Sequence, residues 1–235
     1  MMRAKADEIL KIIDPIIGVA GKGAEVNFDL TSETIETSIT NESHSAMCLM
    51  RAEVSRSEHI KGYRTGDMSV ALNIDRLTSA LKTFGTQWVS ISSSGTCVTV
   101  ENDTGRRTMR TLSPGSAPTM RDFPVSARIP ADPADLKRAC AFVGIGDSMQ
   151  FALKAGRLSI GCSSDDETAE IFIDTDLCID IGSFYSSELM SDIFRRIHSD
   201  GFVAIGLGED APVCLEFEYD CAEFRIFVAP RIETA

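Results

Sequence analysis

A unit of one amphipathic helix followed by short strands recurs along this chain and constrains its fold more than any other feature. Helices are expected at residues 6–19, 74–84, 133–142 and 186–197. Recurrence of one unit along a chain indicates internal duplication. Each helix alone would expose an apolar face, whereas two units together can bury their helices against a shared sheet. The pattern therefore predicts an α+β protein with two similar halves, in each of which two helices pack on antiparallel sheets.

The first helix shows the pattern most clearly, because its isoleucines follow helical spacing along one stripe: Ile9, Ile12, Ile13, Ile16 and Ile17. Pro15 lies within this segment and is expected to bend or shorten the helix, since proline lacks a backbone N–H. Asp132, directly before Pro133, is a typical residue for capping the start of the third helix. Alternating or apolar runs predict strands at 25–30, 35–40, 45–54, 68–72, 88–93, 96–101, 106–112, 124–129, 149–154, 158–162, 168–174, 177–181, 202–207, 213–219 and 224–229.

Residues 113–123 form the clearest linker in the sequence. They read Ser-Pro-Gly-Ser-Ala-Pro-Thr-Met-Arg-Asp-Phe, and the two prolines and the glycine disfavour regular structure. We therefore predict an N-terminal domain at 1–112 and a C-terminal domain at 124–235, joined by this connector.

The composition limits the kind of function that the chain can have. The net charge of −12 argues against a nucleic-acid partner unless positive charge is concentrated locally, because phosphate contacts need Lys and Arg. The seven cysteines lack the close spacing of a metal site, so we expect reduced and mostly buried thiols. No apolar run approaches the roughly 18 residues of a membrane span, and the N-terminus does not resemble a signal peptide. We therefore expect an intracellular protein without membrane contact.

No catalytic pattern stands out in the sequence. The three histidines, His44, His59 and His198, do not have the spacing of a zinc motif. The acidic run at 165–167 lies in a Ser/Asp stretch typical of a hairpin turn, and the glycines at 144–146 lack the lysine and following helix of a phosphate-binding loop. We therefore expect a protein that is not an enzyme and that needs no metal or cofactor.

Charges are ordered along the predicted helices. Acidic residues lie near the N-terminus of three helices and basic residues lie further along, namely Arg76, Lys82, Lys137, Arg138, Arg195 and Arg196. The order is less clear in the first helix, where Asp14 follows Lys11. One interpretation is compensation of the helix dipoles on a solvated face. The other is that all four helices line one basic surface.

Two predicted strands carry opposite charge. Alternation places Arg106 and Arg110 on one face of a basic strand, and Glu170 and Asp174 on one face of an acidic strand. If both are edge strands, a head-to-tail contact between copies of the chain can close into a ring. Alternatively, both are solvated edges whose charge discourages aggregation.

Five segments in series resemble motifs of one family. The C-terminal Val228-Ala229-Pro230-Arg231-Ile232-Glu233 is similar to the L-A-P-(K/R)-I-E ending of proliferating cell nuclear antigen (PCNA), the archaeal and eukaryotic sliding clamp. Segments 43–47 (SHSAM), 70–77 (VALNIDRL), 145–147 (IGD) and 211–219 (APVCLEFEY) resemble further family motifs in matching order. The resemblance covers essentially the whole chain. It implies two domains per chain and three chains per closed ring, with a continuous outer sheet and helices lining the hole.

The resemblance also assigns site residues. Non-specific contacts to double-stranded DNA fall on Lys11, Arg76, Lys82, Lys137, Arg138, Arg195 and Arg196. The ring contact falls on Arg106, Arg107, Arg110, Glu167, Glu170 and Asp174. A pocket for a PIP-type peptide, Q-x-x-hydrophobic-x-x-aromatic-aromatic, falls on Thr40, Ser45, Met47, Met120, Pro212, Phe227, Ala229, Pro230 and Ile232.

The chain departs from the family pattern near that pocket. The connector is short and lacks the usual acidic stretch, Asn41 replaces a common aspartate, and Thr40 and Ser45 replace larger apolar residues. We therefore expect an altered partner affinity or preference.

The resemblance implies a homotrimeric DNA clamp that tethers polymerase, flap nuclease, ligase and clamp loader. Its expected location is with the chromosome in the cytoplasm, or in the nucleus if the source is eukaryotic. Two alternatives remain open: a subunit of a heterotrimeric clamp, and a monomeric peptide-binding adaptor that does not encircle DNA.

Overall fold

The computed structural model describes residues 1–63, 66–115, 118, 123–209 and 211–231. The elements in chain order are β1 (Met2–Lys5), α1 (Ala6–Ala20), β2 (Glu25–Leu30), β3 (Thr34–Thr40), β4 (Ala46–Glu53), the 3-10 helix η1 (Val54–Arg56), β5 (Ile60–Lys61), β6 (Met68–Asn73), α2 (Ile74–Lys82), β7 (Trp88–Ser93), β8 (Cys97–Asn102), β9 (Gly105–Arg110), β10 (Ala127–Ala131), α3 (Pro133–Ala139), the 3-10 helix η2 (Cys140–Phe142), β11 (Ser148–Lys154), β12 (Arg157–Ser163), β13 (Thr168–Asp174), β14 (Ile181–Ser186), α4 (Ser187–Arg195), β15 (Val203–Leu207), β16 (Val213–Tyr219) and β17 (Ala222–Val228).

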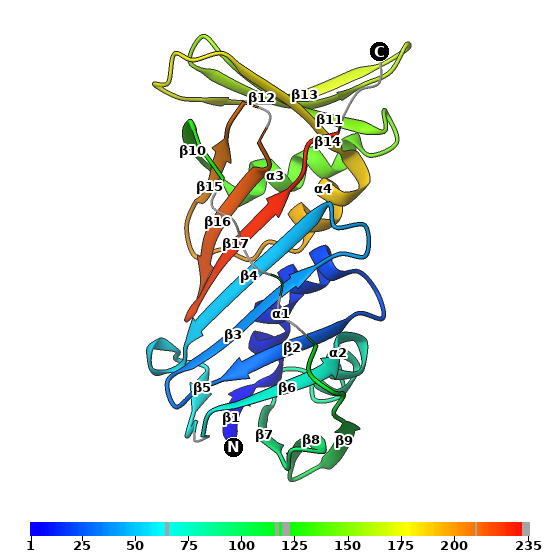
Figure 1. Ribbon diagram of the computed structural model, residues 1–235, viewed down its shortest axis with the longest axis vertical. Helices are drawn as coiled ribbons and strands as arrows, with labels where there is room; N and C mark the ends of the chain where they lie inside the picture. The colour runs from blue at the N-terminus through cyan, green and yellow to red at the C-terminus, as the bar shows by residue number, and fades with distance from the viewer. Residues whose placement is uncertain (64–65, 116–117, 119–122, 210, 232–235) are drawn as a thin grey trace.

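One eight-stranded antiparallel sheet runs through the middle of the molecule. Its order is β10-β15-β16-β17-β4-β3-β2-β6, so each half of the chain contributes four strands that are neighbours within the sheet. The two sets meet where β17 pairs with β4, with Phe227 opposite Met47. The halves are therefore joined by an uninterrupted hydrogen-bonded ladder rather than by side-chain contact alone (Figure 1).

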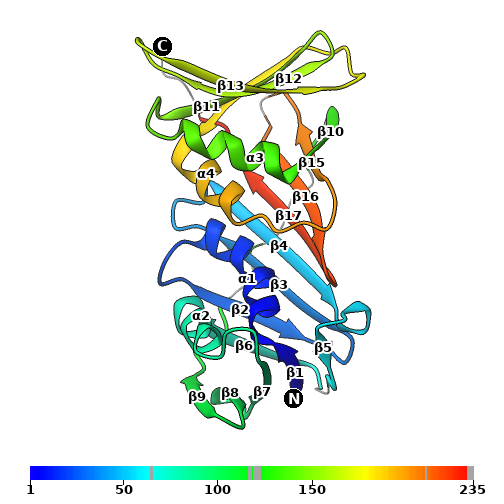
Figure 2. The ribbon, with the colours of Figure 1, turned by 180° about the vertical axis from the view of Figure 1, so that it is seen from behind.

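Two smaller sheets lie at opposite ends of the long axis (Figure 1). Their orders are β5-β1-β7-β8-β9 and β13-β12-β11-β14, which makes β9 and β13 edge strands. The four α-helices lie together on one face of the central sheet, with α1 and α4 adjacent at the middle (Figure 2). None of the helices that the structure describes covers the opposite face of the central sheet, which is called the helix-free face below.

The duplicated unit is one strand, one helix and three strands. It occurs as β1-α1-β2-β3-β4, β6-α2-β7-β8-β9, β10-α3-β11-β12-β13 and β14-α4-β15-β16-β17. This arrangement confirms the predicted α+β fold of two similar halves with antiparallel sheets. The strand before the first helix, β1, and the short β5 were not predicted from the sequence.

Side-chain caps and buried stripes explain where the helices lie. The Asn73 side chain accepts from the backbone N–H of Arg76 at 3.1 Å, and Asp132 accepts from that of Ala134 at 2.7 Å. Both caps satisfy donors that an α-helix leaves unpaired at its start. The isoleucine stripe of α1 is buried, as the periodicity predicts.

Two local predictions differ from the structure. Pro15 does not shorten α1, which continues to Ala20 because the apolar residues on both sides of the proline are buried in the core, so the shortening among the two expected effects is wrong. The strand expected at 177–181 instead begins at Ile181. Its ladder with β11 starts there, where Leu153 lies opposite Ile181, whereas Cys178 and Ile179 are exposed.

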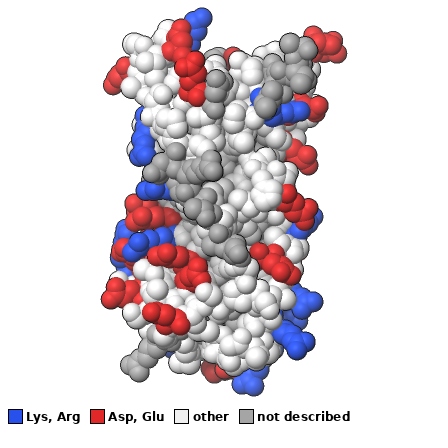
Figure 3. Space-filling model, viewed as in Figure 1, with Lys and Arg blue, Asp and Glu red and all other residues white. Residues whose placement is uncertain are grey.

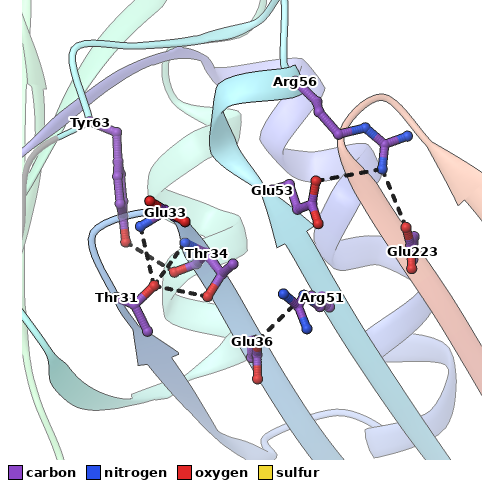
Figure 4. Close-up of polar contacts among 9 residues, drawn as sticks. All are labelled: Thr31, Glu33, Thr34, Glu36, Arg51, Glu53, Arg56, Tyr63 and Glu223. Carbon is purple, nitrogen blue, oxygen red and sulfur yellow. Dashed lines mark hydrogen bonds and ion pairs between the residues drawn. The ribbon is translucent and has the colours of Figure 1, made fainter.

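A charged cluster crosses the junction of the halves at one end of the central sheet (Figure 4). Arg56 Nη1 lies 3.3 Å from Glu223 Oε1 on β17 and 3.9 Å from Glu53 Oε2 on β4. Nearby, Arg51 Nε on β4 lies 3.6 Å from Glu36 Oε1 on β3. These side chains are largely exposed, so each pair contributes about 0–1 kcal/mol and the backbone ladder supplies most of the connection.

Candidate functional site

Five of the seven basic residues assigned to DNA are exposed on the helix face. They are Arg76 and Lys82 on α2, Lys137 and Arg138 on α3, and Arg195 on α4. The sequence places them there because the apolar residues between them, such as Leu77 and Leu136, are buried against the sheets. The helix face therefore presents positive charge in a chain whose net charge is −12.

The exposed bases differ in how far they are already paired. Arg138 forms an ion pair with Asp135, and Arg195 Nη1 lies 3.8 Å from Asp192 Oδ1. Both pairs are at the surface, where an ion pair contributes about 0–1 kcal/mol. Arg76, Lys82 and Lys137 form no ion pair with another residue that the structure describes. These three side chains are the most available to a phosphate group.

Lys11 contacts Glu8 on its own helix and Tyr219 in the second half of the chain. Its Nζ lies 3.0 Å from Glu8 Oε1 and 5.7 Å from the centre of the Tyr219 ring, and the Tyr219 hydroxyl donates to the same carboxylate. Burial alone would raise the pKa of Glu8, but the hydrogen bonds from Tyr219 and Lys11 outweigh it and lower the pKa. Burial and the bond to Glu8 raise the pKa of Tyr219 to about 12. The positive charge of Lys11 is therefore largely engaged within the chain.

Arg196 is engaged in a similar way. Its Nη1 lies 2.6 Å from Asp14 Oδ1, and His198 Nε2 lies 3.2 Å from Asp14 Oδ2. Burial would raise the pKa of Asp14, but the hydrogen bonds from His198 and Arg196 outweigh it and hold the pKa below its ordinary value. Both Lys11 and Arg196 thus connect α1 with the second half, a role that the sequence pattern did not indicate.

The two charged strands lie at the edges of the two end sheets, far apart in the molecule (Figure 1). On β9, Arg106 pairs with Glu101 of the neighbouring strand, and Arg107 Nη2 donates to Ser79 Oγ at 3.3 Å. On β13, Asp174 Oδ1 lies 2.8 Å from Arg157 Nε. Arg110 and Glu170 are exposed and form no ion pair with any residue that the structure describes. Glu167 lies just before β13, where its backbone N–H donates to Ser164 Oγ at 3.2 Å.

Each edge strand has one face toward the helices and one face away from them. Met109 is buried opposite Val98, so Arg106 and Arg110 lie on the face that points away. Ile173 is buried opposite Leu158, so Glu170, Phe172 and Asp174 also lie on the outer face. Phe172 is 56% exposed, and the guanidinium of Arg157 lies 5.6 Å from its ring centre.

The residues assigned to the peptide pocket gather on the helix-free face of the central sheet. Thr40, Met47 and Phe227 lie side by side on three adjacent strands. The Ala229 N–H donates to the Ser45 carbonyl at 2.8 Å, which extends this row beyond the strands. Figure 3 shows that charged side chains lie mainly toward the margins of this face. The structure therefore brings the described members of this set together on a surface of low charge.

Other members of the set lie at its border or outside the described residues. Pro212 and Pro230 are half-buried, and the segment after Pro230 turns so that the Arg231 N–H donates to the Phe184 carbonyl at 2.7 Å. Met120 and Ile232 lie outside the described residues. Sequence reasoning missed Phe123, whose ring centre lies 5.7 Å from that of Phe227. Its position as the one aromatic residue of the 113–123 connector was the available signal.

The Asn41 side chain organises the loop beside this row. Its Oδ1 accepts from the backbone N–H groups of Ser45 and Ala46 at 2.9 and 3.0 Å, and its Nδ2 donates to Ser45 Oγ at 3.0 Å. Asn41 can therefore perform the turn-stabilising task of an aspartate without adding a negative charge.

Within the described part of the chain, no group of three His, Cys, Asp or Glu side chains is placed to hold a metal ion. Among the described helices, none has the length and hydropathy needed to span a bilayer.

Comparison with known proteins identifies relatives along nearly the whole chain. No protein-family model matches the sequence. The chain is 24% identical over 225 residues to the DNA polymerase sliding clamp of Thermoplasma acidophilum, covering 89% of this chain and 91% of the relative. It is 24% identical over 249 residues to that of Methanosarcina mazei, covering 97% and 96%. The structure of A. fulgidus PCNA bound to the C-terminal region of FEN-1 matches with a TM-score of 0.86 and 18% identity over 100% of both chains. These comparisons confirm the resemblance to sliding clamps and the fold class.

Proposed function

We propose that this chain is a subunit of a DNA sliding clamp, a ring without enzymatic activity that encircles double-stranded DNA and tethers replication and repair proteins to it. The observation that carries the proposal is the placement of two oppositely charged edge strands at opposite ends of one molecule whose helices all lie on a single face. Such ends suit head-to-tail closure, and such a face suits the lining of a hole. The full-length similarity to curated sliding clamps supports the same function.

In this proposal the chain comprises two clamp domains, at 1–112 and 124–235, joined by the connector at 113–123. Three chains then form one ring of six domains. The continuous central sheet within each chain supplies three of the junctions around the ring. The contact between β9 of one chain and β13 of the next supplies the other three.

We infer an antiparallel register for that contact, since every pair of named strands in this chain is antiparallel. With Thr108 opposite Phe172 of the next chain, Arg106 lies opposite Asp174 and Arg110 lies opposite Glu170. The outer faces of the two strands then meet with opposite charges on both sides of the aromatic ring. Cross-strand pairs of this kind contribute roughly 0.2–1 kcal/mol each.

The same register joins the faces that point toward the helices. It places Met109, which is buried in this chain, opposite Ile171 of the next chain. One alignment therefore matches acid with base on the outer face and Met109 with Ile171 on the inner face, where it also sets Arg107 opposite Ile173. Because a single chain carries both complementary edges, a homotrimer is favoured over a heterotrimer.

The exposed helix bases are proposed to contact DNA phosphates inside the ring. Arg76, Lys82, Lys137, Arg138 and Arg195 are the main candidates, since Lys11 and Arg196 are engaged within the chain. Contacts to phosphate carry no sequence information, so the ring can slide. Its retention on DNA then depends on topological closure rather than on tight binding.

The helix-free face is proposed to receive PIP-type peptides from polymerase, clamp loader, flap nuclease and ligase. The row of Thr40, Met47 and Phe227 supplies an uncharged floor, and the segment at 228–231 supplies backbone groups for strand addition. In this proposal the protein acts at the chromosome, which lies in the cytoplasm of an archaeal cell and in the nucleus of a eukaryotic cell.

Light scattering after size exclusion, at several protein and salt concentrations, tests the assembly. The proposal predicts a mass of about three times 25.5 kDa at low salt, with dissociation as salt rises because the outer-face pairs are exposed. A monomer at all concentrations would contradict the homotrimer. Copurifying sister chains would then indicate a heterotrimeric clamp, and their absence would indicate a monomeric peptide-binding adaptor.

A further inference from the structure

The first half of the chain contains an apolar cavity of about 150 Å³. It lies between α1, the central sheet and the end sheet that contains β7. Its lining is largely apolar and includes Ile9, Ile13, Leu72, Leu77 and Ile91. The cavity reaches the surface near Ser93, which is exposed.

The internal repeat provides a comparison for this cavity. In the units that begin with β1 and β14, each strand runs directly into its helix. Counting from the first residue of each helix makes Ala4 the counterpart of Tyr185 and makes Ile13 the counterpart of Phe194. All four side chains are buried. At equivalent core positions, the first half therefore has the smaller side chain and the second half has the larger one.

The neighbouring strands extend the comparison. Ile91 on β7 lies opposite Met2 of β1, and Phe151 on β11 lies opposite Ser183 of β14. Met2 and Ser183 each lie four residues before the first residue of their helix, so they occupy equivalent positions. Their partners on the neighbouring strands, Ile91 and Phe151, are therefore equivalent as well. By the same count, Ser93 is the counterpart of Leu153, which is 1% exposed.

Three aromatic rings fill the second half at these positions. The centre of the Phe151 ring lies 5.2 Å from that of Tyr185 and 6.3 Å from that of Phe194, and all three side chains are fully buried. Their counterparts in the first half are an alanine and two isoleucines. Ile13 and Ile91 both line the cavity, so the space lies where the aromatic rings of the other half would be.

We propose that this cavity is a binding site for a small apolar ligand of about the size of benzene. Cavities of roughly 150 Å³ with an aliphatic lining remain dry and bind benzene or xenon in another protein. Polar groups are few here. The Tyr63 hydroxyl already donates to the Thr34 carbonyl at 3.3 Å (Figure 4). The other polar side chains of the lining are Ser92, which is half-buried, and Ser93, which is exposed. Water therefore gains few hydrogen bonds inside, whereas an apolar molecule gains contacts with the whole lining. The site is separate from the helix bases, the edge strands and the peptide face.

The test is titration of the full-length protein with benzene and, separately, with xenon, observed by NMR of isotope-labelled isoleucine methyl groups. The site predicts saturable shifts of the Ile9, Ile13 and Ile91 methyls while methyls of the second half stay unchanged. At a ligand concentration ten times the dissociation constant, the folding equilibrium constant should rise about tenfold.

Two variants introduce, in the first half, the residue that occupies the equivalent position of the second half. Ile91→Phe should abolish the saturable shifts, and Ser93→Leu, which changes only the mouth of the cavity, should weaken them if the first variant does not fold. The reciprocal Phe151→Ile should create a second set of shifts in the other half. The absence of saturable shifts in the wild type, or their persistence in folded Ile91→Phe, would overturn the proposal.

Discussion

Reversal of one charge on the basic edge, Arg110→Glu, should dissociate the ring. The inferred register places Arg110 opposite Glu170 of the next chain, and both side chains are exposed and without an ion pair among the described residues. The substitution replaces an attraction with a repulsion between like charges. A cross-strand charge pair is worth roughly 0.2–1 kcal/mol, and a repulsion of similar size replaces it, so the change costs about 0.4–2 kcal/mol at each contact.

Ring closure multiplies this effect. Separation of a trimer into monomers breaks all three contacts, so the total cost is roughly 1–6 kcal/mol, or about tenfold to 10⁴-fold in the trimer–monomer equilibrium constant. Sedimentation equilibrium at low salt measures this constant. The salt must be low because exposed pairs are screened at high ionic strength.

A second substitution makes the assay specific. Glu170→Arg alone should weaken assembly to a similar extent, and the double variant should restore most of the lost stability because the pair is rebuilt with its charges exchanged. Arg51→Glu, the same charge change in the middle of the central sheet, serves as the control and should leave assembly unchanged. Additive losses in the double variant would refute the register.

Three further predictions concern the helix face, the junction and the peptide face. A triple variant in which Lys82, Lys137 and Arg195 are each replaced by Glu should lower loading on DNA and processivity at least tenfold while the trimer mass stays unchanged. Unimpaired processivity would show that the helix bases do not contact DNA. Asp14→Asn should destabilise the chain by about 1–2 kcal/mol at pH 7, since it removes a charged hydrogen-bond acceptor. Because the pKa of Asp14 is lowered in the folded chain, its contribution is present above the ordinary value of about 3.9 and is lost as pH falls through the folded-state pKa. Denaturant unfolding from pH 7 to pH 2 should therefore show a smaller loss of stability at acid pH in the variant, and equal pH dependence would contradict the pairing. Met47→Asp should lower the affinity for a fluorescent PIP-type peptide at least tenfold in anisotropy titrations without changing assembly. Unchanged affinity would show that the peptide binds elsewhere.

Much of the fold could be predicted because its signals are local. The isoleucine stripe of α1 and the caps at Asn73 and Asp132 each depend on residues within one or two helical turns. The strands β2, β7, β13 and β16 were predicted with their observed bounds for the same reason, since each has a clear period or a turn on both sides. The two strands that were missed, β1 and β5, are short and are held by pairing with each other and with β7. Such pairing has no signature within a segment of two to four residues.

The candidate site was less predictable because it depends on distant pairs. The contact of Asp14 with Arg196 joins residues 182 positions apart, and that of Glu8 with Tyr219 joins residues 211 apart. The sequence shows only that each residue is charged or polar. It therefore could not separate bases that face solvent from bases that are engaged within the chain. The contact of Phe123 with Phe227 could not be predicted for the same reason, because only the fold brings these two rings together.

Retention on circular DNA tests the central claim most directly. The labelled protein is loaded by a clamp loader with ATP onto a nicked circular plasmid, freed of unbound protein by gel filtration, and then treated with a restriction enzyme that cuts once. A ring that encircles DNA predicts stable retention on the circle, at salt concentrations at which light scattering still finds the trimer, and release within minutes of linearisation. Equal retention before and after the cut would show binding by affinity rather than by topology and would contradict the sliding-clamp account.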